Sequence, residues 1–197
     1  MIKEIANRRS IRKYSECEIS DEDIRDIIES GILAPSAKNR QPWKFIVVKG
    51  RQKEEMLDVF RRGIMREETE DALLINSRQH LAAAKYTIKI MEQAPVSIFV
   101  MDAQGKGLFT PLNEEDRIYE IVNVQSIGAA IQNMLLTATE KGMGSLWICD
   151  IFFAYQELCE WLGEEGDLLA AVALGYPQEA PHARPRKRLE DVTVWKE

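Results

Sequence analysis

Apolar residues along the chain follow two alternating patterns. Four short runs are apolar almost without interruption, as buried strands are, and they cover Phe45–Val48, Val96–Val100, Ser145–Ile148 and Leu168–Leu174. Between and around them the apolar positions fall at helical spacing, over Gln52–Phe60, Leu81–Met91, Glu114–Lys141 and Tyr155–Leu162. The pattern predicts a chain in which helices alternate with buried strands.

A further helix is predicted near the N-terminus from its capping signature. Ser20 is followed by three acidic residues, and a serine there can satisfy the free N–H groups of a first helical turn. Ile24, Ile27 and Ile28 follow near helical spacing. Gly31 is the expected end of this helix, because glycine is common just past a helix C-terminus.

Two segments indicate contact with a second subunit. The middle of the longest helix, Gln125–Leu136, is apolar nearly all round, so it is either central or part of a subunit interface. Val192–Trp195 is a β-prone tetrapeptide with no hairpin partner nearby. Pairing with the edge of another subunit's sheet would cover such a strand.

Composition narrows the class of protein. The 197 residues are 45% hydrophobic and 29% charged, which suits one soluble globular domain over 1–197. The net charge of −6 disfavours a general nucleic-acid or membrane-surface binder. No uncharged stretch reaches the ~20 residues that span a bilayer. We expect no membrane partner, no nucleic acid and a cytoplasmic location.

The residues that bind metals or form disulfides are few. Cys17, Cys149 and Cys159 are odd in number and lack metal-ligand spacing, so they are predicted to be reduced thiols. His80 and His182 stand alone. No metal site is expected.

Positive charge is concentrated at the two ends of this acidic chain. Residues 1–13 carry a net charge of +4, residues 182–188 also carry +4, and the remainder therefore carries −14. One interpretation is that both islands converge on a shared anion, such as a phosphate of charge about −1.5 to −2. The alternatives are two solvated basic ends, or a short basic patch that touches nucleic acid.

Two polar segments are candidates for ligand binding. In the first, residues 8–12, an extended backbone would place Arg8, Ser10 and Arg12 on one side, where they could grip a phosphate. The alternative is a helix end with surface arginines. The second, residues 34–43, packs two prolines, two amides and a tryptophan before a strand. It is either a tight connection or a ligand wall.

Together these segments resemble the FMN-dependent nitroreductase family. The resemblance covers essentially the whole chain. It rests on Arg-Arg-Ser-x-Arg at 8–12, Pro-Ser-x-x-Asn-x-Gln-Pro-Trp at 35–43, Ala-Pro-Val at 94–96, Gly-Ala-Ala-x-Gln-Asn at 128–133, Lys-Gly-Met-Gly-Ser-Leu-Trp at 141–147, Leu-Gly-Tyr-Pro at 174–177 and Pro-Arg-Lys-Arg-Leu at 185–189. It implies an α+β, three-layer fold whose central, mostly antiparallel sheet is flanked by helices. It also implies a homodimer with FMN at the interface and a C-terminal strand exchanged between subunits.

The resemblance also assigns cofactor-binding residues. The phosphate, ribityl chain and pyrimidine edge of FMN would contact Arg8, Arg9, Ser10 and Arg12, with Arg186 and Arg188 completing the phosphate clamp. From the other subunit, the flavin would be lined by Pro35, Ser36, Ala37 and Asn39. The backbone of Trp147, Ile148, Cys149 and Asp150 would face the N5 and O4 edge. No side chain is expected to be an obligatory chemical catalyst. Cys149 has no base nearby in the sequence that could activate its sulfur. The resemblance implies that its backbone, rather than its sulfur, faces the flavin.

The implied reaction is ping-pong. NAD(P)H would reduce FMN by hydride transfer to N5, and reduced FMN would then reduce a small aromatic or quinone-like acceptor, such as a nitroaromatic. Residues 61–92 and 103–117 are expected to cover the acceptor pocket. Two alternatives stay open: a non-catalytic FMN-binding sensor or carrier on the same fold, and a specialised family reaction such as reductive dehalogenation.

Overall fold

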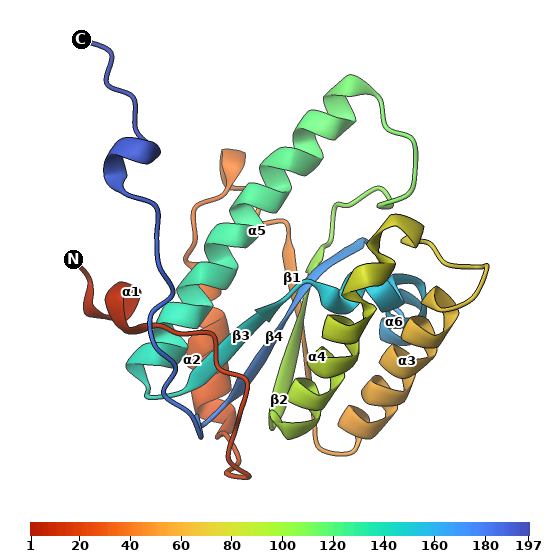
Figure 1. The fold of residues 1–197 in the computed structure, drawn as a ribbon. Coiled ribbons are helices and arrows are strands. Elements are labelled where there is room, and N and C mark those ends of the chain that lie inside the picture. Colours follow the sequence, from red (N-terminus) through yellow and green to blue (C-terminus); the bar gives the residue numbers. More distant parts are fainter.

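A four-stranded antiparallel sheet forms the centre of the computed structural model, which describes residues 1–197 (Figure 1). The strands are β1 (Trp43–Lys49), β2 (Val96–Asp102), β3 (Gly144–Ile148) and β4 (Asp167–Gly175). Their order in the sheet is β1-β2-β4-β3, and every neighbouring pair is antiparallel. All four predicted strands are therefore confirmed, and the central pair, β2 and β4, is the most deeply buried.

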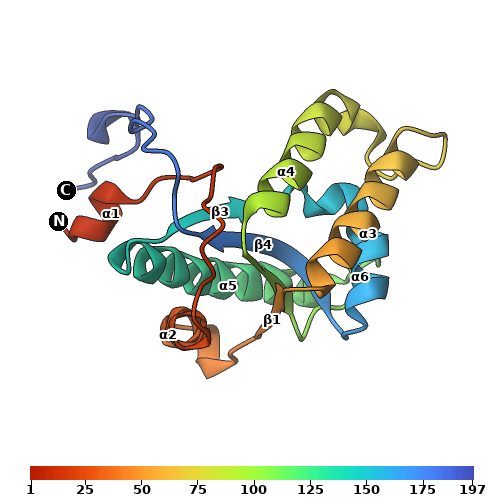
Figure 2. The same cartoon turned by 90° about the horizontal axis from the view of Figure 1, so that it is seen from below.

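Helices cover both faces of the sheet, which gives three layers (Figure 2). One face carries α2 (Asp21–Ile32) and α5 (Glu114–Glu140), and the other carries α3 (Gln52–Glu67), α4 (Leu81–Gln93) and α6 (Tyr155–Leu162). A short α1 (Lys3–Asn7) begins the chain. Short 3₁₀ helices η1 to η4 span Ala37–Asn39, Ile75–His80, Asp150–Ala154 and Leu189–Asp191. The predicted α+β fold with a flanked antiparallel sheet is confirmed. No helix is both long and apolar enough to cross a membrane.

The alternation of side chains along β2 divides the interior into two cores. Phe99 and Met101 pack in the core beneath α3, α4 and α6, whereas Ile98 and Val100 pack in the core beneath α2 and α5. Successive strand residues point to opposite faces, so a strand between two helical layers must be apolar at every position. This explains the uninterrupted apolar runs in the sequence.

The sequence analysis predicted that Gly31 ends its helix, and this prediction was wrong. Helix α2 continues to Ile32, with Leu33 as its C-cap, and Gly31 is buried inside it. A Cβ at this position would lie 2.9 Å from Cγ of Met134 on α5 and 3.4 Å from the Ala130 carbonyl oxygen. The glycine is therefore a close-packing residue between α2 and α5 rather than a stop signal.

Much of the outer surface of α5 is open in the single chain. Its middle, Gln125–Leu136, is buried or half-buried at every position except Gln125. In its N-terminal half, however, Ile118 is 61% exposed, and Ile121 and Val124 are also exposed. An exposed apolar stripe of this kind is typical of an interaction surface.

The C-terminal tetrapeptide Val192–Trp195 forms no strand in the chain. It follows η4 as an extended tail, and Val194 and Trp195 are 85% and 78% exposed. A strand needs a neighbouring strand to satisfy its backbone groups, and no part of the same chain supplies one here. Exchange of this segment with a second subunit stays a prediction.

Candidate functional site

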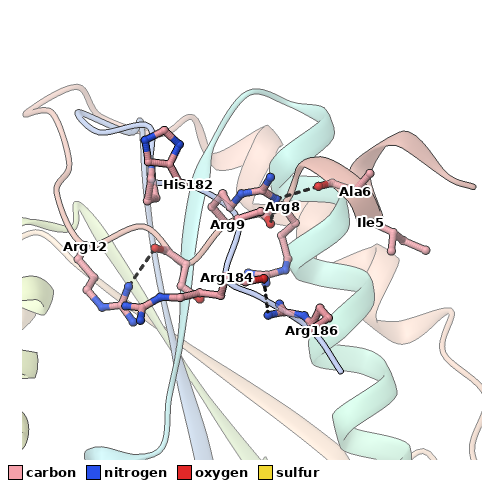
Figure 3. A pocket seen from close by; sticks show the side chains of 11 residues that line it. Ile5, Ala6, Arg8, Arg9, Arg12, His182, Arg184 and Arg186 are labelled. Atoms are coloured by element: carbon pink, nitrogen blue, oxygen red, sulfur yellow. Dashed lines mark hydrogen bonds between the residues drawn. The ribbon is translucent and has the colours of Figure 1, made fainter. Parts of the chain in front are cut away.

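The two basic islands meet in one pocket. The pocket has a volume of about 410 Å³, and its lining comes from residues 5–12 and 181–186 only (Figure 3). Five guanidinium side chains surround it, those of Arg8, Arg9, Arg12, Arg184 and Arg186. The convergence inferred from the charge distribution is therefore present in the structure.

The N-terminal side of the pocket is fixed to the edge of the sheet. Ser10 forms a parallel β-bridge with Ser145 of β3, and the Ile11 N–H donates to the Ser145 carbonyl at 3.0 Å. The buried Ile11 side chain packs over Gly144, where a Cβ would lie only 2.7 Å from it. Because neighbouring side chains of an extended segment point to opposite sides, Ser10 and Arg12 face outward into the pocket.

The C-terminal side is held by a crossing with the same N-terminal segment. Tyr14 and Pro177 form an antiparallel bridge, flanked by hydrogen bonds from the Ser15 N–H to the Tyr176 carbonyl and from the Gln178 N–H to the Lys13 carbonyl, both 2.9 Å. The Arg12 N–H then donates to the Glu179 carboxylate at 2.5 Å. These contacts hold residues 176–179, which follow β4, against the N-terminal segment. The next part of the tail, with Arg184 and Arg186, then lines the pocket.

The guanidinium groups are braced but not neutralised. Arg9 donates to the carbonyls of Ala6 and Arg8 at 2.8 Å, and Arg12 and Arg186 donate to nearby carbonyls at 3.2 Å. None of the five is in an ion pair. Burial lowers the pKa of Arg8, and the nearby charges of Arg186 and Arg9 lower it further. Concentrated, uncompensated positive charge of this kind suits a phosphate.

Arg188 lies outside this pocket. Its side chain is exposed and pairs with Asp191 at 2.9 Å, two residues beyond the last arginine that lines the cavity. Arg184 takes a lining position that the motif comparison did not assign. The sequence signal that could have identified Arg184 was the positive charge of residues 182–188 as a whole, because this signal does not depend on a motif.

The segment containing Pro35, Ser36, Ala37 and Asn39 lies elsewhere. It forms η1 and its approach beside α5, and none of the four residues lines the arginine pocket. Lys38, Asn39 and Gln41 have positive φ angles of 54°, 54° and 47°, which non-glycine residues rarely adopt. The Ser36 hydroxyl accepts a hydrogen bond from the Gln41 N–H at 3.0 Å and closes this turn. Strained, exposed turns of this kind often occur at binding sites.

The exit from β3 lies one strand length from the arginines. Ser145 pairs with Ser10, and Cys149 follows four residues later, about 13 Å away along an extended strand. Ile148 is buried, whereas Trp147 and Cys149 are exposed. The next residue, Asp150, accepts a hydrogen bond of 2.5 Å from the hydroxyl of buried Thr87 on α4. This bond ties the exit to the helical layer behind it.

The Cys149 thiol is poorly suited to act as a nucleophile. Although part of the residue is exposed, partial desolvation by neighbouring atoms raises the pKa of its thiol, and the charge of Asp150 raises it further. A reactive cysteine needs the opposite environment, one that favours the thiolate. That the backbone of Cys149 contacts a flavin stays a prediction.

Two buried carboxylates hold the loop after β2, and the sequence analysis did not single them out. Asp167 is 4% exposed and accepts hydrogen bonds from the N–H groups of Gly107 at 3.0 Å and Leu108 at 2.8 Å, and from the Tyr155 hydroxyl at 2.8 Å. Its cross-strand neighbour Asp102 is 2% exposed and accepts from Asn123 at 3.0 Å. The only sequence signal was an aspartate next to each apolar run, with Asp102 just after the first run and Asp167 just before the second.

The loop anchored in this way presents an aromatic side chain beside the β3 exit. Phe109 is exposed, and its ring packs edge-to-face on Tyr155 with the ring centroids 5.5 Å apart. Tyr155 begins α6 immediately after η3, which itself follows Cys149. The Phe109 ring therefore lies against the start of the helix that follows the β3 exit.

Comparison with known proteins gives a consistent picture. Residues 5–176 match the Nitroreductase family. A protein of Archaeoglobus fulgidus with the provisional name NADH dehydrogenase/NAD(P)H nitroreductase is 34% identical over 185 residues, which cover 90% of this chain and 86% of that protein.

Solved structures share the whole fold. A provisionally assigned nitroreductase of Desulfovibrio desulfuricans, crystallised with FMN, is 28% identical with a TM-score of 0.72 and covers 100% of this chain and 96% of its own. A BluB-like flavoprotein of Clostridium difficile is 27% identical with a TM-score of 0.73, over 98% of this chain and 97% of its own. The match of the family to most of the chain and the sequence identity of the relative lead to one conclusion: this chain belongs to the Nitroreductase family.

Proposed function

We propose that the protein is an FMN-dependent NAD(P)H oxidoreductase that reduces a small aromatic or quinone-like acceptor. The observation that carries the proposal is the pocket in which Arg8 and Arg186 converge without a carboxylate to neutralise them. The family membership, the FMN in the Desulfovibrio structure and the name of the Archaeoglobus relative support it.

The donor set of the pocket fits a flavin mononucleotide. A terminal phosphate needs several charge-assisted donors, and guanidinium groups supply them in a matching geometry. Arg8, Arg9, Ser10 and Arg186 would hold this phosphate. The β3 edge then leads to the exit at Trp147–Asp150, where the exposed residues Trp147 and Cys149 would be accessible to a ring.

The chain's own residues would position and polarise such a ligand. When bound, FMN supplies hydride acceptance from NAD(P)H and electron transfer to the acceptor. Arg12 would favour negative charge on a ring bound beside it, because a preorganised cation lowers the energy of charge that develops nearby. The bond between Thr87 and Asp150 would keep the β3 exit in one orientation, and Phe109 would limit the space beside it.

We also propose that the active protein is a homodimer. The exposed apolar residues of α5 and of the Val192–Trp195 tail would be buried against a second copy. The turn with Pro35, Ser36, Ala37 and Asn39 lies apart from the arginine pocket of its own chain, which agrees with a site that combines segments of two chains.

An absorption spectrum and a reduction experiment test the function. The purified protein should be yellow, and extraction should give FMN rather than FAD. In anaerobic stopped flow, NAD(P)H should bleach the flavin absorbance, and a nitroaromatic or quinone should restore it. A protein that binds FMN but stays yellow with both nicotinamides would be a sensor or carrier, and a protein without affinity for FMN would refute the proposal altogether.

A complementation experiment tests the dimer. Arg8→Ala and Asn39→Asp homodimers should each bind FMN poorly. In a heterodimer of the two variants, one site would carry both changes and the other neither. FMN should then bind with near-normal affinity at half the stoichiometry. A stable, active, flavin-loaded monomer in light scattering would contradict the dimer.

A further inference from the structure

The arginine pocket carries more positive charge than one flavin phosphate can balance. Five guanidinium groups line it, and the only carboxylate bonded to its rim is that of Glu179, which accepts from the Arg12 backbone. A phosphate monoester carries about −1.5 to −2 at neutral pH. At least two positive charges would therefore face each other without a counterion after the flavin phosphate is bound.

The five cations fall into two groups within the cavity. Arg8 lies with Arg186 and Arg9, the two cations whose fields act on it most. Figure 3 shows the Arg184 side chain extending away from this group toward Arg12. The two groups offer separate places at which an anion can be bound by guanidinium donors.

Arg8 and Arg184 are the two least committed of the five, and Arg8 is already assigned to the proposed flavin phosphate. Arg9, Arg12 and Arg186 each donate to a backbone carbonyl, and Arg8 is half-buried among other cations. The Arg184 guanidinium makes no hydrogen bond and no ion pair within the chain, although its backbone carbonyl accepts from Arg186. A free guanidinium that lines a cavity is available to a ligand without losing any existing contact.

We propose that the pocket binds a second phosphate group beside the flavin phosphate, and that Arg184 selects it. This inference rests on the proposed FMN site at Arg8 and Arg186. The chemistry recognised is a phosphate monoester dianion. It has two possible sources, the 2′-phosphate of NADPH and a free phosphate or small phosphorylated compound.

The first test measures inorganic phosphate binding to the FMN-loaded protein by calorimetry in a buffer free of other phosphate. The wild type should bind one phosphate per chain. Arg184→Ala should weaken this binding about tenfold, as expected for the loss of one charge-assisted contact of ~1.4 kcal/mol. Lys187→Ala is the matched control, because it removes a positive charge from the same tail at a residue that does not line the pocket. Its effect should be less than twofold.

Steady-state kinetics separate the two sources. If the 2′-phosphate of NADPH is the ligand, Arg184→Ala should lower the ratio of kcat/KM for NADPH to that for NADH about tenfold, and inorganic phosphate should compete with NADPH only. If the source is a free or small phosphorylated compound, the ratio should not change while phosphate binding still weakens. Both outcomes support the second site.

Two results would overturn the proposal. One is an FMN-loaded wild type that binds no phosphate, and the other is an equal loss of affinity in the Arg184→Ala and Lys187→Ala variants, which would indicate a diffuse field. Failure of the FMN proposal is distinguished by flavin content. In that case the flavin-free wild type should still bind two phosphates per chain, and Arg184→Ala should bind one of the two about tenfold more weakly; a single phosphate per chain in the wild type would again refute the second site.

Discussion

Arg8→Ala should weaken ligand binding without lowering the stability of the ligand-free protein. Arg8 lines the arginine pocket, makes no ion pair and is half-buried. If it contacts the FMN phosphate, its removal deletes a charge-assisted hydrogen bond in a partly shielded site. Such bonds contribute about 1.5–3 kcal/mol, which corresponds to a roughly 10- to 150-fold increase in the Kd for FMN.

The flavin-free protein should respond differently. The lowered pKa of Arg8 means that its charge is less favourable in the folded pocket than in water, because of burial and the nearby Arg186 and Arg9. Replacing Arg8 by alanine removes this repulsion. The unfolding midpoint of the flavin-free variant should therefore equal or exceed that of the wild type at pH 7. If Arg8 served only to stabilise the fold, its replacement by alanine would lower the unfolding midpoint instead.

Fluorescence titration with FMN and urea unfolding of the flavin-free protein measure the two quantities. Lys106→Ala is the control, because Lys106 pairs with Asp116 at 2.6 Å and lies outside the pocket. It should change the Kd for FMN by less than twofold. The reasoning fails if Arg8→Ala binds FMN as tightly as the wild type. It also fails if the flavin-free variant loses stability in parallel with affinity.

Three further changes test other parts of the structure. Thr87→Val deletes the hydroxyl that donates to Asp150 and should lower the free energy of unfolding by about 1–3 kcal/mol, with Thr87→Ser restoring most of it in urea titration. Burial raises the pKa of Asp102 above its ordinary value of 3.8, so the folded state disfavours its charge as pH rises through that raised pKa. Asp102→Asn should consequently be more stable than the wild type at pH 7, with the gap closing near pH 4; a less stable variant at pH 7 would contradict this. Gly63→Ala would place a Cβ 2.3 Å from Cβ of Ala154, so it should cost about 1–3 kcal/mol in thermal or urea unfolding, and an unchanged midpoint would show that the contact relaxes freely.

The sheet could be predicted from the sequence because its strands are buried on both faces. The apolar runs at Val96–Val100 and Leu168–Leu174 are short and rich in β-branched residues or bounded by turn residues, as strands buried on both faces are, and they form the central strands β2 and β4. The pairing order could not be read in the same way, since an apolar run does not encode its neighbour. Gly31 failed as a stop because glycine serves close packing as readily as a helix end, and only the position of Met134 distinguishes the two.

The part of the candidate site that could be predicted from the sequence is the part that carries a high density of positive charge. The two basic islands stood out against an acidic chain, and they do form one pocket. Arg184 and Arg188 show the limit, because they carry equal charges four residues apart on one tail, yet Arg184 lines the pocket and Arg188 pairs with Asp191 outside it. The anchoring of the loop by Asp167 also escaped prediction, since its donors are backbone N–H groups that leave no trace in the sequence.

The crossing of the two terminal segments sets the order in which the protein can become functional during its synthesis. The contact between Arg12 and Glu179 joins residues 167 positions apart, so the pocket stays open at one side until residues 179–186 have emerged from the ribosome. Contacts of such long range form late, because the closure of a large loop must precede them. A ligand that binds only the completed pocket stabilises only finished molecules, by an amount that grows with the logarithm of its concentration. Cofactor supply would then act as a quality check on newly made chains, and prematurely terminated ones would gain no protection from it.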